Sequence, residues 1–111
     1  MRVGNLETKR DFTDVRDMVK AYARAAEACE AGQAYNIGTG VSYKIGDILD
    51  MLLAMANLKI EIQKEESLFR PSDIPELRCD ATKFNQATEW KPTISLEQTL
   101  QDLLAYWRNI V

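Results

Sequence analysis

Apolar side chains recur at helical spacing in the first third of the chain. Between Thr13 and Cys29 they lie three or four residues apart, Thr13 is a possible N-cap, and Gly32 follows the last turn. This pattern predicts an amphipathic helix that ends before Gly32. Its apolar positions are Val15, Met18, Val19, Tyr22, Ala25, Ala26 and Cys29.

The middle of the chain predicts strand, helix and strand. The apolar run "AYNIG" at 34–38 predicts a short strand, and Ser42 caps a predicted helix over 43–56. "KIEIQKE" at 59–65 alternates apolar and charged residues, as a half-buried strand does. The apolar face of the predicted helix holds Ile45, Ile48, Leu49, Leu52 and Leu53.

Two prolines and two capping residues organise the last third. Pro71 and Pro75 keep 70–77 out of helix and sheet interior, so we expect a loop there. Asp80 caps a short predicted helix over 81–88, and Ser95 with Gln98 forms a capping box ahead of a terminal helix. The order of elements predicts the α/β class, with both tryptophans, Trp90 and Trp107, packed inside.

Composition narrows the classes of function. The chain has 111 residues, which is one domain at most. Its 17 acidic side chains outnumber its 14 basic ones, so no excess of positive charge favours binding to nucleic acid or to an anionic membrane. The absence of histidine excludes Ser-His-Asp triads and His-containing zinc sites. The longest apolar run, "ILDMLLAMA", is too short to span a membrane, and because no apolar segment follows the basic residues at the start of the chain we expect no signal peptide. We therefore expect a cytoplasmic protein.

Two cysteines are too few for a metal centre. Cys29 and Cys79 lie fifty positions apart without CxxC spacing, so they cannot complete a tetrahedral site by themselves. In a reducing compartment we expect free thiols. The sequence leaves a disulfide between them open.

The stretch "AYNIGTG" begins in the manner of many nucleotide-binding loops. A dinucleotide fingerprint requires G-x-G-x-x-G, and Gly38 and Gly40 supply only its first two glycines because Tyr43 occupies the third position. No G-K-[ST] follows either. We therefore expect the two glycines to supply positive φ angles in a turn rather than to hold a phosphate, and we set aside a free-standing NAD-binding module.

Two arginines are the better candidates for binding an anion. Arg10 precedes the first predicted helix, and Arg70 opens the proline-braced loop that also carries Asp73. A guanidinium can form a bidentate pair with a phosphate, and a carboxylate can accept hydrogen bonds from a sugar hydroxyl. Ordinary ion pairs remain the alternative, with Asp11 or Asp14 for Arg10 and with Asp73 or Glu66 for Arg70.

Taken together, several blocks resemble a known enzyme family. The blocks "GNLETKRDFTDVRDMVKAY", "AYNIGTG", "RPSDIPEL" with "DATKF", and "WKP" before "SLEQTLQDLLAYWR" cover nearly the whole chain in order. They are similar to the C-terminal, substrate-binding part of an extended short-chain dehydrogenase/reductase that acts on sugar nucleotides. The resemblance is closest to GDP-mannose 4,6-dehydratase and GDP-4-keto-6-deoxy-mannose reductase. It implies part of a Rossmann-like α/β fold.

The resemblance also implies roles for particular residues. Arg10 and Arg70 would contact the nucleotide diphosphate sugar, and Asp73 would stand where the family has a carboxylate for the ribose or base. The "GNL" block, with Asn5 and Leu6, would line the same cleft, while Asp17 would be a structural residue of the helix start. Phe12, Thr13 and Asp73 favour the reductase side of the family.

The chain departs from the family pattern at the catalytic centre. No tyrosine has a lysine four residues later, so the Tyr-x-x-x-Lys pair of these enzymes is absent, as is the cofactor fingerprint. We therefore expect residues 1–111 to be one sugar-nucleotide-binding domain without catalytic residues and inactive alone. NADP would be held elsewhere in the intact enzyme, with no cofactor on this chain.

A second hypothesis belongs to another class. The chain would be a non-enzymatic interaction module that keeps the fold and associates through surfaces covered in the intact family members. Uncovered apolar helix faces predict a homo-oligomer under either hypothesis. A GDP-hexose is the expected ligand, and neither nucleic acid nor a membrane is an expected partner. The nucleotide base, the sugar and the reaction remain open.

Overall fold

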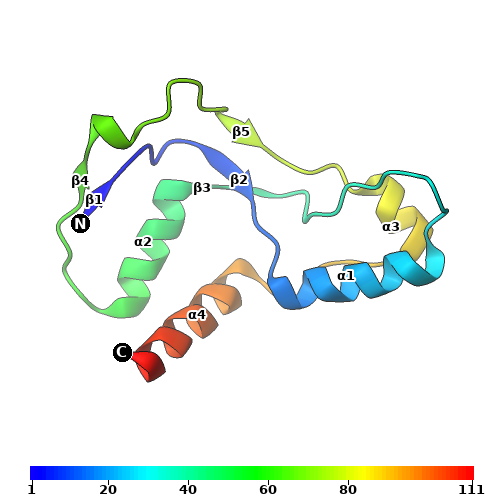
Figure 1. Ribbon diagram of the computed structural model, residues 1–111. Helices are drawn as coiled ribbons and strands as arrows, with labels where there is room; N and C mark the ends of the chain where they lie inside the picture. Colours follow the sequence, from blue (N-terminus) through cyan, green and yellow to red (C-terminus); the bar gives the residue numbers. More distant parts are fainter.

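Two small sheets and four helices form a flat, open body in the computed structural model, which describes residues 1–111 (Figure 1). The molecule measures 49 × 37 × 19 Å, with α2 and α4 toward one end and α1 and α3 toward the other. The elements are β1 (Arg2–Val3), β2 (Lys9–Asp11), α1 (Val15–Ala28), β3 (Ser42–Lys44), α2 (Ile45–Ala56), β4 (Gln63–Lys64), a 3₁₀ turn (Glu66–Leu68), β5 (Glu76–Leu77), α3 (Thr82–Thr88) and α4 (Leu96–Ile110). The predicted α/β class is confirmed.

The central strand, β2, carries Arg10, for which no strand was predicted. Strand β2 lies between β3, to which it is antiparallel, and β5, to which it is parallel. Arg10 is opposite Tyr43 on one side and Leu77 on the other. Strands β1 and β4 form a separate parallel pair. The loop prediction for 70–77 is therefore correct only as far as β5.

The first two helices begin later than predicted. Helix α1 is capped by Asp14, not Thr13, because the Asp14 carboxylate accepts a hydrogen bond from the amide of Arg16 at 2.8 Å. Helix α2 begins at Ile45, since Ser42 belongs to β3 and does not cap it. The periodicity located both helices, but it did not distinguish the cap from the residues just before it.

The last two helices lie where they were predicted, except that α3 begins at Thr82 and has Ala81, not Asp80, as its N-cap. Asp80 accepts hydrogen bonds from the amide and hydroxyl of Thr82 at the start of α3. At the start of α4 the Ser95 hydroxyl accepts from the Gln98 amide at 3.1 Å. The Gln98 side chain donates forward to Asp102 instead of back to Ser95, so only half of the capping box forms.

The predicted strand over 34–38 does not form, because no other strand pairs with it. Tyr35, Asn36 and Ile37 make no backbone–backbone hydrogen bonds, although the side chains of Tyr35 and Ile37 pack on the core. The strand predicted over 59–65 shrinks to the two residues of β4 for a related reason. Its only partner, β1, is two residues long.

The buried core is small and lies between α1 and α3. Ala21, Phe84 and Trp90 form it, and the Phe84 and Trp90 rings meet edge to face with centroids 5.7 Å apart. The prediction for Trp90 is thus confirmed, since it is 5% exposed. The prediction for Trp107 is wrong, because this residue lies on the outer face of α4 and is 53% exposed.

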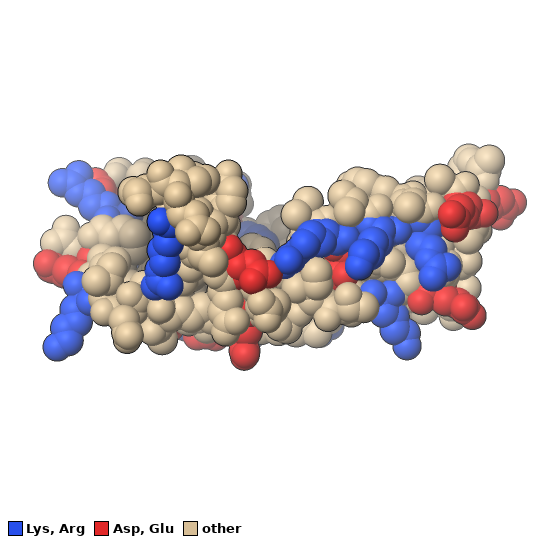
Figure 2. Space-filling model, turned by 90° about the horizontal axis from the view of Figure 1, so that it is seen from below, with Lys and Arg blue, Asp and Glu red and all other residues tan.

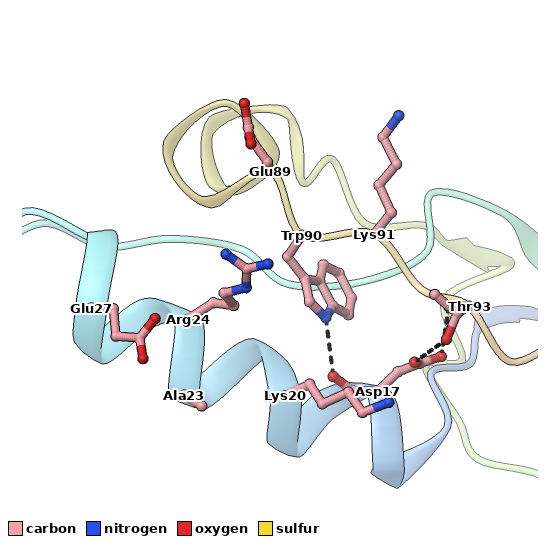
Figure 3. A pocket seen from close by; sticks show the side chains of 9 residues that line it. All are labelled: Asp17, Lys20, Ala23, Arg24, Glu27, Glu89, Trp90, Lys91 and Thr93. Carbon is pink, nitrogen blue, oxygen red and sulfur yellow. Dashed lines mark hydrogen bonds between the residues drawn. The ribbon is translucent and has the colours of Figure 1, made fainter.

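Asp17 anchors the segment that leads from the core to α4. Its carboxylate, 1% exposed, accepts hydrogen bonds from the amides of Thr93 and Ile94 at 3.0 and 2.9 Å. The Thr93 hydroxyl donates to the same carboxylate, and the Trp90 indole donates to the Asp17 carbonyl at 3.1 Å (Figure 3). Asp17 therefore has the structural role expected of it.

Neither cysteine is paired, as predicted: Cys29 and Cys79 are half-buried free thiols. Burial raises the pKa of the Cys79 thiol, and the charges of Asp11 and Asp80 add to this effect. None of the helices combines the length and apolar character needed to cross a membrane.

Candidate functional site

Four of the five predicted site residues line one hollow beside the central strand. The hollow has a volume of about 260 Å³ and lies between β2, the start of α2 and the segment 68–73. Its predicted members are Asn5, Arg10, Arg70 and Asp73. Thr8, Ile45 and Leu68 complete the lining, and none of the three was predicted as a site residue.

Arg10 is held firmly by groups from two segments. Its Nη2 donates to Asp73 Oδ1 at 3.0 Å, and its Nη1 donates to the carbonyls of Lys9 and Ile74 at 2.7 and 2.8 Å. The Arg10 and Asp73 side chains are about one-quarter exposed, so this ion pair is partly shielded from water. Neither Asp11 nor Asp14, the partners proposed from the sequence, pairs with Arg10.

Asp73 connects the loop to the N-terminal segment as well. Its Oδ2 accepts from the Asn5 amide at 3.3 Å, while the Asn5 carbonyl oxygen accepts from the backbone amide of Glu7. Both Asn5 and Arg10 therefore donate to one carboxylate. These hydrogen bonds join the segments that carry Asn5, Arg10 and Asp73 into one wall of the hollow.

Arg70 is the uncommitted cation of the hollow. Its guanidinium makes no ion pair and no hydrogen bond, so the pairs with Asp73 or Glu66 considered from the sequence do not form. An exposed guanidinium beside a hollow is available to an anionic ligand. Of the two arginines, Arg70 alone has all five N–H donors unused, whereas Arg10 uses three of its five.

Leu6 does not line the hollow, in contrast to Asn5. Its carbonyl accepts a hydrogen bond from the Gly46 amide at 2.9 Å, which joins the N-terminal segment to the first turn of α2. Gly4 lies close by, where a Cβ would stand 2.9 Å from the carbonyl oxygen of Leu68. The "GNL" block thus shapes the hollow through its backbone and through Asn5.

The glycine turn after Ile37 faces a carboxylate of the chain itself. Asp11 accepts hydrogen bonds from the amides of Thr39 and Gly40 at 3.1 and 2.8 Å, and from the amide of Cys79 at 3.1 Å. Burial alone would raise the pKa of Asp11, but the hydrogen bonds from Thr39, Cys79 and Gly40 together lower it. Sequence reasoning considered Asp11 only as a partner for Arg10 and missed this role.

The turn does not fit the pyrophosphate of a dinucleotide cofactor. Its amides are already hydrogen bonded to Asp11, and Tyr43 lies in β3 where the third glycine of a fingerprint would stand. Only one of the two expected positive φ angles occurs, at Gly40 with φ +80°, so that expectation for Gly38 is wrong. Gly38 is needed for close approach, because a Cβ there would lie 2.4 Å from the Cβ of Cys79.

A larger hollow of about 490 Å³ lies between α1 and the segment 89–93 (Figure 3). Lys20, Arg24 and Lys91 border it together with Glu27 and Glu89. Seen from below Figure 1, the half of the molecule that contains α1 carries a row of basic side chains, with acidic side chains beside them (Figure 2). The mixed charges do not favour one class of ligand, so the hollow around Arg70 is the better candidate site.

The chain matches known proteins over its whole length. The family model described as GDP-mannose 4,6 dehydratase matches residues 1–103. GDP-6-deoxy-D-mannose reductase of Pseudomonas aeruginosa is 32% identical over all 111 residues, which cover 36% of that protein. GDP-mannose 4,6 dehydratase 1 of Arabidopsis thaliana is 26% identical over 101 residues, covering 89% of this chain and 28% of the relative.

Solved structures agree with these sequence matches. RMD from Pseudomonas aeruginosa, complexed with NADPH, superposes with a TM-score of 0.93 at 32% identity over 100% of this chain and 36% of that one. UDP-glucose 4-epimerase of Thermotoga maritima, with UDP-glucose, superposes with a TM-score of 0.89 at 26% identity. The match covers 99% of this chain and 35% of that one. The chain thus spans about a third of the length of its relatives. The family model over residues 1–103, the sequence match and the fold show that the chain belongs to the GDP-mannose 4,6 dehydratase family of nucleotide-sugar enzymes.

Proposed function

We propose that residues 1–111 form the sugar-nucleotide-binding domain of an NAD(P)-dependent enzyme that acts on a GDP-hexose. The observation that supports this most is the hollow in which Arg70, uncommitted to any partner, stands beside the Arg10–Asp73 pair. The family supplies the class of ligand, because the relatives include GDP-sugar reductases and dehydratases.

The hollow offers groups suited to a nucleotide diphosphate. Arg70 would donate hydrogen bonds to phosphate oxygens, and Asp73, which already accepts from Asn5 and Arg10, would accept from a ribose hydroxyl. A phosphate that also reached Arg10 could accept from its Nε–H and from the second Nη2–H, because Lys9, Ile74 and Asp73 take only three of its five donors. Arg10 would then bridge ligand and loop, so that ligand binding orders segment 70–75.

The catalytic chemistry of the intact enzyme would lie outside this chain. We assign no catalytic residue to positions 1–111 and expect the isolated domain to be inactive. In the intact enzyme NADP would supply or accept a hydride, and we expect no cofactor to bind this chain alone. The 32% sequence identity to GDP-6-deoxy-D-mannose reductase, together with Phe12, Thr13 and Asp73, favours a reductase over a dehydratase.

Calorimetric titration with GDP-mannose tests the binding proposal. The wild-type domain should bind, and Arg70→Ala should weaken the affinity at least about tenfold, because a hydrogen bond to a charged group contributes about 1.5–3 kcal/mol. Arg24→Ala is the matched control, since Arg24 lies on α1 outside the hollow. Absence of heat with folded wild-type protein, or equal affinities for the two variants, would contradict the proposal.

An interaction module remains the second candidate, supported by a different observation. The unpaired backbone of Tyr35–Ile37 and the exposed apolar residues of α1 leave surfaces that another polypeptide can cover. In this alternative the chain would associate with itself or with another chain without binding nucleotide. Titration distinguishes the two, because the module would show association but no GDP-mannose binding.

A further inference from the structure

Four hydrogen-bond donors converge on the Asp11 carboxylate. Oδ1 accepts from the amide of Thr39 at 3.1 Å and from its hydroxyl, while Oδ2 accepts from the amides of Gly40 and Cys79 at 2.8 and 3.1 Å. Consecutive backbone amides directed at one anion are the arrangement with which glycine-rich turns hold phosphate groups. Here the anion is a side chain from a strand 28 positions earlier.

The two glycines are required by this arrangement. At Gly38 a Cβ would approach the Cys79 Cβ to 2.4 Å, its sulfur to 2.8 Å and Asp11 Oδ2 to 3.3 Å. At Gly40 the backbone has φ +80°, which L side chains rarely adopt. The glycines therefore let the turn approach Asp11 and Cys79 closely and direct its amides at the carboxylate.

We propose that Asp11 is the built-in anion of this glycine turn and, through it, the positioning residue for Arg10. The Asp11 side chain is hydrogen bonded to the turn, and its neighbour Arg10 borders the hollow that contains Arg70. The carboxylate fixes one face of β2 to the turn and to residue 79. The Arg10 backbone is thereby held in place, with Tyr43 and Leu77 opposite it in the sheet.

Chemical rescue tests the first half of the proposal. In Asp11→Ala the turn keeps its donors but loses its acceptor, so the thermal unfolding midpoint should fall. Sodium formate, a small carboxylate, should restore part of that fall, whereas sodium chloride at equal ionic strength should not. Asp80→Ala is the control, because the Asp80 carboxylate accepts only from the amide and hydroxyl of Thr82. Equal effects of formate and chloride on Asp11→Ala would overturn the proposal.

A second variant decides the matter if Asp11→Ala does not fold. Asp11→Asn keeps the shape of the side chain but replaces one acceptor oxygen with a donor. The amide proton resonances of Thr39, Gly40 and Cys79 should then move upfield as their charge-assisted hydrogen bonds are lost. Unchanged resonances at these three amides would show that the carboxylate is not their anion.

The positioning of Arg10 rests on the proposed function and needs a binding measurement. Asp11→Ala should bind GDP-mannose about tenfold more weakly, and formate should restore affinity together with stability, while Asp80→Ala should bind as the wild type does. Undiminished binding by Asp11→Ala would overturn the positioning role alone. Failure of the wild type to bind would overturn the proposed function and the positioning role, while the formate experiment still decides whether Asp11 is the anion of the turn.

Discussion

Three aspartates near the start of the chain each accept hydrogen bonds from residues far along it. Asp11 accepts from Cys79, Asp14 from Thr99, and Asp17 from Thr93. An aspartate in this setting costs more to remove than a surface residue does, because the donors around it lose their partner and are left partly buried.

Replacing Asp17 should be among the most destabilising single changes in the chain. Asp17→Ala leaves the amides of Thr93 and Ile94 and the Thr93 hydroxyl without their acceptor, so we expect the free energy of unfolding to fall by about 3 kcal/mol. Urea unfolding measures this. Glu27→Ala, at an exposed position of the same helix, should change stability by less than about 0.5 kcal/mol. Comparable losses for both variants would contradict the role of Asp17.

Asp14 should make the fold sensitive to acid. Hydrogen bonds from the Arg16 side chain, opposed by burial and reinforced by Thr99, hold the pKa of Asp14 well below its usual range. Since the pKa is lower in the folded than in the unfolded state, the carboxylate stabilises the fold above about pH 4, and this contribution is lost as the pH falls toward the lowered value.

Asp14→Asn should therefore be less stable than the wild type at pH 7 and lose less stability on acidification. Urea unfolding at pH 7, 4 and 3 checks this, with Glu97→Gln as a control for the loss of one negative charge at an exposed helix position. Parallel stability curves for wild type and Asp14→Asn would show that another carboxylate accounts for the acid sensitivity.

At the scale of elements, the glycine turn and the segment after β5 depend on each other. Gly38→Ala forces its new methyl against Cys79 and should cost about 1–3 kcal/mol, the usual range for overpacking. In a Cys79→Gly background the same change should cost much less, since both contacting atoms of Cys79 are removed. A double-mutant cycle in urea measures the difference. An equal cost of Gly38→Ala in both backgrounds would exclude the contact as the cause.

At the scale of the whole molecule, the outer faces of two helices remain uncovered. Val15, Val19 and Tyr22 of α1 are 71%, 55% and 62% exposed, and α4 exposes Tyr106 and Trp107 in a similar way. Such apolar patches on a flat, open body favour association with another polypeptide.

We expect the isolated chain to form dimers or larger assemblies as its concentration rises. Tyr22→Glu should shift the light-scattering mass toward the monomer, because a carboxylate at the centre of the α1 face opposes its burial. Lys20→Ala, on the same helix, is the matched control and should leave the mass unchanged. A monomeric mass for the wild type at high concentration would show that these faces do not drive self-association.

The helices were predictable because their signals are local. The hydrogen bonds of α3 and α4 connect residues four apart, and Asp80 and Ser95 accept hydrogen bonds from residues only two or three positions further on. Strands β1, β2, β3 and β5 were missed because each has only two or three residues and is defined by partners far along the chain. The failed strand over 34–38 shows the same dependence, since an apolar run is not a strand until another backbone pairs with it.

The amino-acid sequence by itself determined the α/β class, the four helices, the family and four residues that share one hollow. These follow from local periodicity, capping residues and the order of characteristic blocks. Only the tertiary structure decided that Arg10 pairs with Asp73, that Arg70 stays free and that Asp11 occupies the glycine turn. The partners in these contacts lie 28 to 68 positions apart, and the choice among many carboxylates and donors is made when the sheet forms and brings particular groups within hydrogen-bond distance.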